Sequence, residues 1–268
     1  MINICTTFVG RHRVFPYWAA ALRSALVNLA DETVEEVRLY WLDQDASGRT
    51  ERLLRQLRED LPVNADVTYE QEFSLPTFPK RAGQSPGNRA EVIARANQVL
   101  LDMAPAGEDV VMWEDDIVAP ANGPWRLLQV GSDPQAWIVG ATQYPRARTP
   151  HYLLAWHWNE FPVWDTEPLG EVRWELEPLK PRHEMPRGVL EIGAVAWGLV
   201  YVAGEFRNAH RLRAEGTRGH DVMAAWDTIY TSGRRVLLDW ATKCPHLEEQ
   251  VTVHKSEQCK TDVREWQK

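Results

Sequence analysis

Three carboxylates stand at the end of an apolar run in the stretch EDVVMWEDDIVAP, from Glu108 to Pro120. The letters VVM predict a short buried strand, and Glu114, Asp115 and Asp116 follow it after one tryptophan. Three like charges held together raise the electrostatic energy unless a positive group lies among them. Hard divalent cations such as Mg²⁺ and Mn²⁺ take carboxylate oxygens as ligands. The stretch therefore indicates either a divalent metal site or an acidic corner between a strand and a loop.

The C-terminal part of the sequence supplies further groups that suit this chemistry. Asp221 stands at the start of a helix expected over Asp221–Thr231, so it is either a helix cap or a general base. His246 and His254 are rival candidates for an imidazole ligand, and imidazole suits Mn²⁺ better than Mg²⁺. Either histidine also fits an ordinary turn. Local sequence alone leaves these alternatives open.

The elements that must position these groups alternate along the N-terminal half of the chain. This order predicts an α/β fold with a doubly wound, mostly parallel sheet, whose ligands lie beyond the carboxyl ends of the strands. Polar residues stand at those ends: Thr6, Thr7 and Arg11 at the end of the first strand, and Asp43 at the end of the second. We expect strands at Ile2–Val9, Glu36–Asp43, Ala65–Phe73 and Val110–Met112, and helices at Pro16–Asn28, Gly48–Leu61 and Asn88–Met103.

No glycine-rich dinucleotide fingerprint or phosphate-binding loop follows any of these strands, which argues against a Rossmann dehydrogenase and a P-loop enzyme. Ser74–Gly87 is rich in proline and glycine and predicts a loop. The second half is expected to have a strand at Ala136–Tyr144, an excursion at Arg146–Arg187, an apolar return at Val189–Phe206 and a strand at Val236–Leu238.

Composition limits the classes of partner. The chain has 268 residues and a formal net charge of −8, which disfavours a protein that binds nucleic acid through a strongly basic surface. Three scattered cysteines indicate neither a disulfide framework nor a structural zinc site, so we expect a cytoplasmic protein. No segment has the length and apolarity of a membrane span. Thirteen tryptophans exceed what core packing requires, and one or two of them could stack on a sugar-like ligand.

Several stretches together resemble a known family. TTFVGRHRVFPYWAAALRSAL is similar to the opening strand and helix of the GT-A glycosyltransferases, and LDQDASG to the end of their second strand. The closest match is NRAEVIARANQVLLDMAPAGEDVVMWEDDI, which is similar to the helix and strand that lead to their Asp-X-Asp motif. GAVAWGLVYVAGEF and GHDVMAAWDTIYTSGRRVLLDWATKCPH continue the likeness as far as His246. The resemblance is strongest to the inverting family 2 type.

The resemblance implies a nucleotide-sugar donor, Mn²⁺ or Mg²⁺, and a set of site residues. Asp116 and His246 would be the metal ligands, and Asp221 the catalytic base, preceded by His220 where the family often has an acid. Glu114 replaces the usual first Asp of the motif. The implied donor-binding residues are Thr6, Thr7, Arg11, Asp43, Arg95, Glu114 and Asp115, and the acceptor-binding residues are Trp156, Trp158 and Trp197.

The expected function is the transfer of a sugar from a nucleoside-diphosphate sugar, most simply a UDP-sugar, to a glycan, lipid or small-molecule hydroxyl with inversion. One domain is expected, with a nucleotide-sugar half (1–120), an acceptor half (121–250) and a tail (251–268). The alternatives are a phage-type glycosyltransferase that acts on hydroxymethylated bases in DNA, a nucleotidyltransferase, and a non-catalytic sugar-binding module on the same scaffold.

Overall fold

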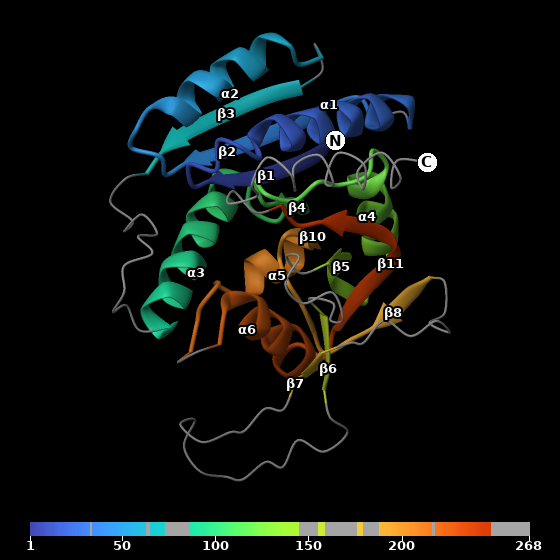
Figure 1. Ribbon diagram of the computed structural model, residues 1–268. Helices are drawn as coiled ribbons and strands as arrows, with labels where there is room; N and C mark the ends of the chain where they lie inside the picture. The colour runs from blue at the N-terminus through green and yellow to red at the C-terminus, as the bar shows by residue number, and fades with distance from the viewer. Residues whose placement is uncertain are drawn as a thin grey trace.

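The computed structural model describes residues 1–32, 34–62, 65–72, 86–144, 155–158, 176–178, 188–215 and 218–247 (Figure 1). The N-terminal half alternates strands and helices, as the sequence predicts. The helix that we expected to begin at Asn88 begins two residues earlier, at Pro86, because proline is well tolerated in the first helical turn. The elements of this half are β1 (Ile2–Phe8), α1 (Phe15–Asp31), β2 (Val37–Asp43), α2 (Arg49–Glu59), β3 (Ala65–Gln71), α3 (Pro86–Met103) and β4 (Val110–Trp113).

The second half contains several shorter elements. The expected helix at Asp221–Thr231 is present as one α-helical and one π-helical segment, whereas the expected strand at Val236–Leu238 is much longer. The sequence did not predict the helix α4. The elements are α4 (Gly123–Gly131), β5 (Ala136–Tyr144), β6 (Ala155–Trp158), β7 (Leu176–Pro178), β8 (Val189–Glu191), β9 (Ala194–Val195), β10 (Leu199–Val202), α5 (Gly204–Ala209), α6 (His220–Trp226), η1 (Asp227–Thr231) and β11 (Arg235–Pro245).

One large sheet organises the molecule, with the strand order β3-β2-β1-β4-β10-β5-β11-β8. The strands β1 to β4 are parallel, and β11 is parallel to β5, but β10 runs antiparallel to both of its neighbours and β8 antiparallel to β11. The sheet is therefore mixed and mostly parallel. A second, three-stranded sheet has the order β7-β6-β9.

The parallel strands β2, β1 and β4 are neighbours, so their carboxyl ends meet at one edge of the sheet. As predicted, these ends carry polar residues, which lie in the last residues of each strand or directly after it: Thr6 to Arg11, Asp43 to Asp45 and Glu114 to Asp116. The chain enters β10 at the same edge, because this strand is antiparallel to β4 and Leu199 pairs with Trp113. This edge, which we call the strand-end edge, positions the candidate site.

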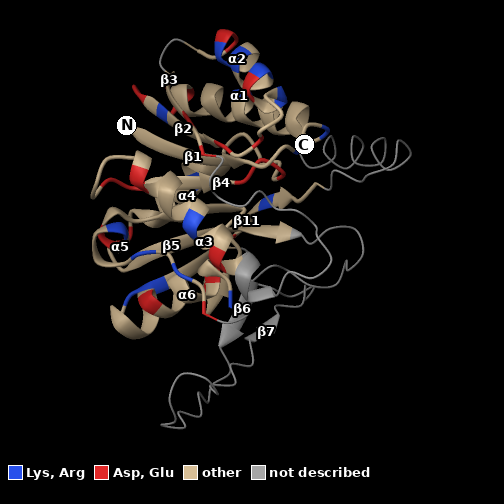
Figure 2. Ribbon diagram, turned by 90° about the vertical axis from the view of Figure 1, so that its left-hand side faces the viewer, with Lys and Arg blue, Asp and Glu red and all other residues tan. Residues whose placement is uncertain are grey.

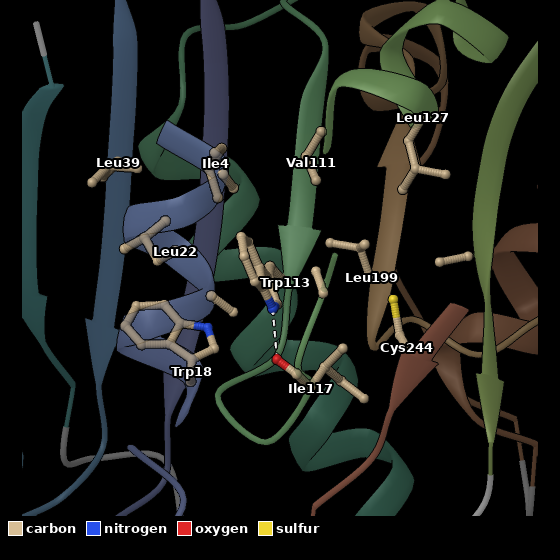
Figure 3. Packing of buried hydrophobic residues seen from close by; sticks show 14 of the residues in the cluster. Ile4, Trp18, Leu22, Leu39, Val111, Trp113, Ile117, Leu127, Leu199 and Cys244 are labelled. Carbon is tan, nitrogen blue, oxygen red and sulfur yellow. Dashed lines mark hydrogen bonds between the residues drawn. The ribbon is translucent and has the colours of Figure 1, made fainter. Parts of the chain in front are cut away.

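Two apolar cores cover the two faces of the large sheet. Helices α1, α2 and α4 pack on one face, and α3, α5 and α6 on the other. In Figure 1, α1 and α2 lie above β1 and β2, and α3 lies below them. Trp18, from α1, packs edge to face against Trp113 with a distance of 6.2 Å between ring centroids (Figure 3). This contact anchors the end of β4, directly before the three acids.

The C-terminal end of α3 is closed by a side chain from α5. The last carbonyl groups of a helix have no partner within the helix. Arg207 donates hydrogen bonds to the carbonyls of Leu101 (2.6 Å) and Ala104 (2.9 Å), and it also bonds those of Pro105 and Glu108 in the following turn. One guanidinium group therefore satisfies four carbonyls and fixes α3 against α5.

Candidate active site

The three acids lie in a tight turn that is fixed by hydrogen bonds from the buried Trp113 and from the neighbouring backbone. The indole N–H of Trp113 donates to the carbonyl of Ile117 (2.9 Å), which Figure 3 shows as a dashed line. The amide of Ile117 donates to the carbonyl of Glu114 (3.2 Å), and the amide of Glu114 donates to the carbonyl of Gly198 (2.8 Å). The chain therefore turns immediately after β4, and the acids do not alternate as they would in a continued strand.

The end of β11 brings a histidine to this turn from 130 residues away. Ile117 and His246 form an antiparallel bridge. The amide of Leu247 donates to the carbonyl of Asp116 (2.7 Å), and that of Val118 to the carbonyl of Pro245 (3.0 Å). As a result, Nε2 of His246 lies 2.8 Å from Oδ2 of Asp116. The sequence-predicted pair of Asp116 and His246 is brought together.

Glu114 completes a group of three metal-compatible side chains. Each of Glu114, Asp116 and His246 offers one ligand atom, and these atoms lie within 4.8 Å of one another. Two carboxylate oxygens and one imidazole nitrogen form a donor set that suits Mn²⁺, and the oxygens also suit Mg²⁺. The residues present therefore fit the metal that the resemblance implies. His254, the rival ligand, lies outside the described residues.

A guanidinium group lies among the acids. Nη1 of Arg11 lies 2.7 Å from Oδ1 of Asp115 and 2.7 Å from Oδ2 of Asp116. The amide of Val9 donates to the other oxygen of Asp115 (3.2 Å). Part of the positive charge that the acids require is therefore supplied by Arg11. Three carboxylates and one guanidinium leave an excess of two negative charges.

The pKa values reflect this crowding. Burial raises the pKa of Glu114, the charge of Asp116 raises it further, and Arg11 and His246 oppose the rise. Burial likewise raises the pKa of Asp115 to about 7, although Arg11 opposes it. A bound cation would favour the charged forms of these groups.

Asp221 faces the same group of acids from the first turn of α6. Its charge contributes to the raised pKa of Glu114, after burial and the charge of Asp116. Oδ1 of Asp221 accepts a hydrogen bond from the amide of Val222 (2.9 Å). A β-carbon on Gly219, the N-cap, would lie only 2.4 Å from that oxygen. Glycine at this position is what lets the carboxylate take its present orientation.

The acids at the end of β2 serve the local turn. Asp43 is fully buried, and its oxygens accept hydrogen bonds from the amide of Asp45 (2.8 Å) and the hydroxyl of Tyr69 (2.8 Å). Asp45 lies 2.6 Å from Nε2 of His12 and accepts hydrogen bonds from Ser47 and Thr50. Burial raises the pKa of Asp43, whereas the hydrogen bonds of Asp45 outweigh its burial and hold its pKa below the usual range. The donor-binding role of Asp43 stays a prediction, and its carboxylate already has two partners.

Sequence reasoning missed Gln44, the next residue. Its side chain is 2% exposed, and neither its amide nitrogen nor its amide oxygen has a hydrogen-bond partner among the described residues. Strand alternation places Gln44 on the side of β2 that carries Tyr40 and Leu42, which is the side that α3 covers. The hydroxyl of Thr6, at the end of β1, is also buried and without a partner among the described residues. Buried polar groups of this kind need an explanation, and a ligand that binds at the strand-end edge is one. A polar residue beside a strand-end acid was the available signal for Gln44.

Other predicted residues have different surroundings. Arg95 is exposed on α3, and no contact within the described part of the chain joins it to the acids. The neighbouring Asn97 is buried instead and lies 3.5 Å from the hydroxyl of Thr7. Trp197 is buried beside His220. For Trp156 and Trp158 the backbone belongs to β6, but the side chains lie outside the described part.

Charge is unevenly distributed over the described surface. Figure 2 shows acidic segments beside β1 and β4, whereas α2 carries basic and acidic segments together. Arg49, Arg52, Arg55 and Arg58 are all exposed on that helix. The acidic character of the strand-end edge is what a site for a cation requires.

Known structures share this fold. GalNAc-T7, solved with UDP, GalNAc and Mn²⁺, aligns with a TM-score of 0.57 over 92% of this chain at 14% identity. Residues 1–349 of Staphylococcus aureus TarS, solved with UDP and with UDP-GlcNAc, align with TM-scores of 0.53 and 10% identity over 91% and 94% of this chain. The chain has the GT-A fold. The family 2 assignment is not confirmed.

The similarity is confined to the fold. The chain spans 43% of the GalNAc-T7 chain and about 60% of the TarS chain, at 59% and 61% in its two complexes. No protein-family model matches the sequence, and no curated protein matches it either. Within the described residues, no helix is both long and apolar enough to cross a bilayer.

Proposed function

We propose that the protein is a metal-dependent glycosyltransferase, which moves a sugar from a nucleoside-diphosphate sugar to an acceptor hydroxyl with inversion of the anomeric carbon. The observation that carries the proposal is the group of Glu114, Asp116 and His246, whose ligand atoms lie within 4.8 Å of one another. The fold supports it, since proteins of similar structure were solved with UDP, UDP-GlcNAc and Mn²⁺.

Asp116 and His246 would hold the metal, with Glu114 beside them. The two negative charges that Arg11 leaves unbalanced match a divalent cation, and the imidazole favours Mn²⁺ over Mg²⁺. When bound, such a cation stabilises the negative charge of the departing diphosphate as a Lewis acid. Arg11 opposes the effect of burial on the pKa of Asp115, and it holds Asp115 and Asp116 in place.

The nucleobase is assigned to the end of β2. Neighbouring strands lie about 4.8 Å apart, so two steps across the sheet separate the ends of β2 and β4 by about 10 Å. A nucleotide with its diphosphate at Asp116 can reach Gln44 with its base. The side-chain amide of Gln44 offers both a donor group and an acceptor oxygen, which match the adjacent N–H and carbonyl of uracil. Thr6, Thr7 and Arg11 lie between these points and are proposed to contact the ribose and diphosphate.

Asp221 is proposed as the general base. It would take the proton of the acceptor hydroxyl while that oxygen attacks the sugar from the face opposite the diphosphate. The carboxylate of Asp221 is suited to this role because it is partly exposed and lies within electrostatic reach of Glu114. A single displacement of this kind inverts the anomeric carbon. Trp197 and the strand β6, with Trp156 and Trp158, are proposed to border the acceptor.

The acceptor is proposed to be a glycan, lipid or small molecule, and the reaction to be cytoplasmic, where the buried free thiols of Cys5 and Cys244 would stay reduced. The alternatives of a DNA glycosyltransferase, a nucleotidyltransferase and a sugar-binding module gain no specific support from the described residues. Their distinguishing signatures are retention on DNA, release of pyrophosphate, and sugar binding without turnover.

Donor hydrolysis tests the proposal. Purified protein is incubated with UDP-, GDP- and CDP-sugars and Mn²⁺, and the released nucleoside diphosphate is measured. We expect turnover that Asp116→Asn reduces at least 100-fold, because it removes a ligand charge at the metal. Asp31→Asn, on the exposed end of α1, is the matched control and should keep full activity. Equal rates in Asp116→Asn and the wild type would refute the metal assignment.

A further inference from the structure

His220 is a buried histidine that contacts residues from two other parts of the chain. It is the first residue of α6 and is 6% exposed. Its Nε2 lies 2.9 Å from Nδ2 of Asn97 on α3. Its ring packs edge to face on Trp197, with 5.1 Å between centroids. The sequence resemblance places an acid at this position, so the imidazole needs its own explanation.

The hydrogen bonds around Asn97 determine which nitrogen of His220 carries the proton. Nδ2 of Asn97 faces the imidazole, and Oδ1 of the same amide lies 3.5 Å from the hydroxyl of Thr7. An amide nitrogen only donates, and a neutral imidazole has one donor and one acceptor nitrogen. Nε2 is therefore the acceptor, and the proton of His220 is on Nδ1.

The surroundings favour the neutral imidazole. Burial lowers the pKa of His220, and the adjacent Asp221 opposes this effect. Asn97 on α3 and Trp197 before β10 contact the ring, and neither carries a charge. A proton on Nε2 would break the bond from Asn97, because two donors would then face each other.

His220 is tied to both halves of the site. Through Asn97 and Thr7 it reaches the end of β1, which leads to Arg11. Through Trp197 it reaches Gly198, whose carbonyl accepts the amide of Glu114 at 2.8 Å. Asp221 is the next residue along α6, so any shift of the imidazole moves the carboxylate relative to the metal group.

We propose that His220 is a positioning residue for Asp221: as a neutral imidazole that accepts from Asn97, it fixes the start of α6, and with it the carboxylate, against the donor half of the site. The inference rests on the proposed role of Asp221 as the base. In this proposal the contacts that join Thr7, Asn97 and His220, which we call the relay, align the base with the donor. Small misplacements of a catalytic group reduce rates by about 100-fold.

Steady-state kinetics with a matched pair of variants test this role. His220→Leu fills a similar volume without an acceptor, and we expect kcat to fall about 10- to 100-fold while the KM for the donor and the Kd for UDP change less than about twofold. His220→Gln supplies an acceptor oxygen in place of Nε2 and should restore most of kcat. The control is His210→Leu, because His210 bonds Ser232 beyond the opposite edge of the sheet. An unchanged kcat in His220→Leu, or equal losses in the Leu and Gln variants, would overturn the proposal.

Two further readouts keep the test decisive if His220→Leu folds poorly. Asn97→Asp keeps the shape but turns an acceptor toward Nε2, so the acid limb of the kcat profile should move to higher pH. Nitrogen-15 NMR of labelled histidine in the wild-type protein should show a protonated Nδ1 and a bare Nε2. A protonated Nε2, or an unmoved acid limb, would refute the relay. Absence of turnover in the wild type with every donor would instead refute the proposed function, and the NMR result would still decide the tautomer.

Discussion

Replacing Gln44 by methionine should move protein stability and nucleotide affinity in opposite directions. Methionine has nearly the length of glutamine but carries no group that needs a hydrogen bond. In the ligand-free protein the Gln44 side chain is 2% exposed, and both polar atoms lack a partner among the described residues. The variant therefore removes an unsatisfied amide from the folded state. In the complex, the same change removes the proposed contacts to the nucleobase.

The sizes of the two effects follow from ordinary hydrogen-bond energies. A buried polar group without a partner costs about 1–3 kcal/mol, so the ligand-free variant should be about 2 kcal/mol more stable. At about 2–4 °C per kcal/mol for a domain of this size, the Tm should rise by about 4–8 °C. Two lost hydrogen bonds of about 0.5–1.5 kcal/mol each should raise the Kd for UDP about 10- to 100-fold.

Calorimetry measures both quantities on the same samples. Scanning calorimetry without ligand gives the Tm, and titration with UDP in the presence of Mn²⁺ gives the Kd. Gln56→Met, on the exposed face of α2, is the matched control and should change neither. A variant that is less stable and binds UDP as tightly as the wild type would refute the reasoning, because Gln44 would then be an ordinary structural residue.

Three further predictions concern the frame of the site. Gly219→Ala should lower kcat at least 10-fold with little loss of stability, because the added β-carbon would lie 2.4 Å from a movable carboxylate oxygen of Asp221. Steady-state kinetics and the Tm measure the two effects. A normal kcat would contradict this placement of the base. Arg207→Met should lower the free energy of unfolding by about 3 kcal/mol in urea denaturation, because it removes the donors that bond four carbonyls. The control Arg211→Met changes an exposed ion pair and should cost less than about 1 kcal/mol. Equal losses in the two variants would exclude the capping role. Burial lowers the pKa of His220 in the folded protein, so the histidine of the unfolded protein binds a proton first as the pH falls below about 6.5. The contribution of His220 to the free energy of unfolding is therefore complete above that pH. It is lost below that pH, by at most about 1.4 kcal/mol per pH unit. Urea titrations from pH 7 to 5 should show a shallower decline for His220→Gln, and parallel curves would refute the assignment.

The order and type of the N-terminal elements could be predicted from the sequence, because hydrophobic periodicity differs between helices and strands and indicates which face of each element is buried. Leu22, Ala25, Leu26 and Leu29 are all buried on α1, as their spacing indicates. The direction of β10 could not be predicted, since an apolar run is compatible with either orientation in a buried sheet. The full length of β11 was also missed, because its register shifts between Asp239 and Lys243, which interrupts the regular strand pattern. The division at residues 120 and 250 stays a prediction.

The candidate site was predictable where a residue type is tied to a strand end. Asp116 follows this rule, whereas His246 was indicated by the resemblance, and β11 brings the two together. The contacts of Asn97, Gln44 and Gly219 depend on side-chain packing between distant elements, which periodicity does not contain. The resemblance assigned donor binding to Asp43, yet that carboxylate is used by Tyr69 and the turn backbone. A single sequence gives no sign of such internal use.

Direct measurement of Mn²⁺ binding tests the central claim. Free Mn²⁺ gives a strong electron paramagnetic resonance signal that weakens on binding, so titration of the purified protein in the presence of UDP yields the Kd and the stoichiometry. The account predicts one Mn²⁺ per chain, with the Kd raised at least 10-fold in Asp116→Asn and in His246→Gln, and unchanged in the control Asp31→Asn. Binding that is absent in the wild type, or equally tight in all four proteins, would contradict it.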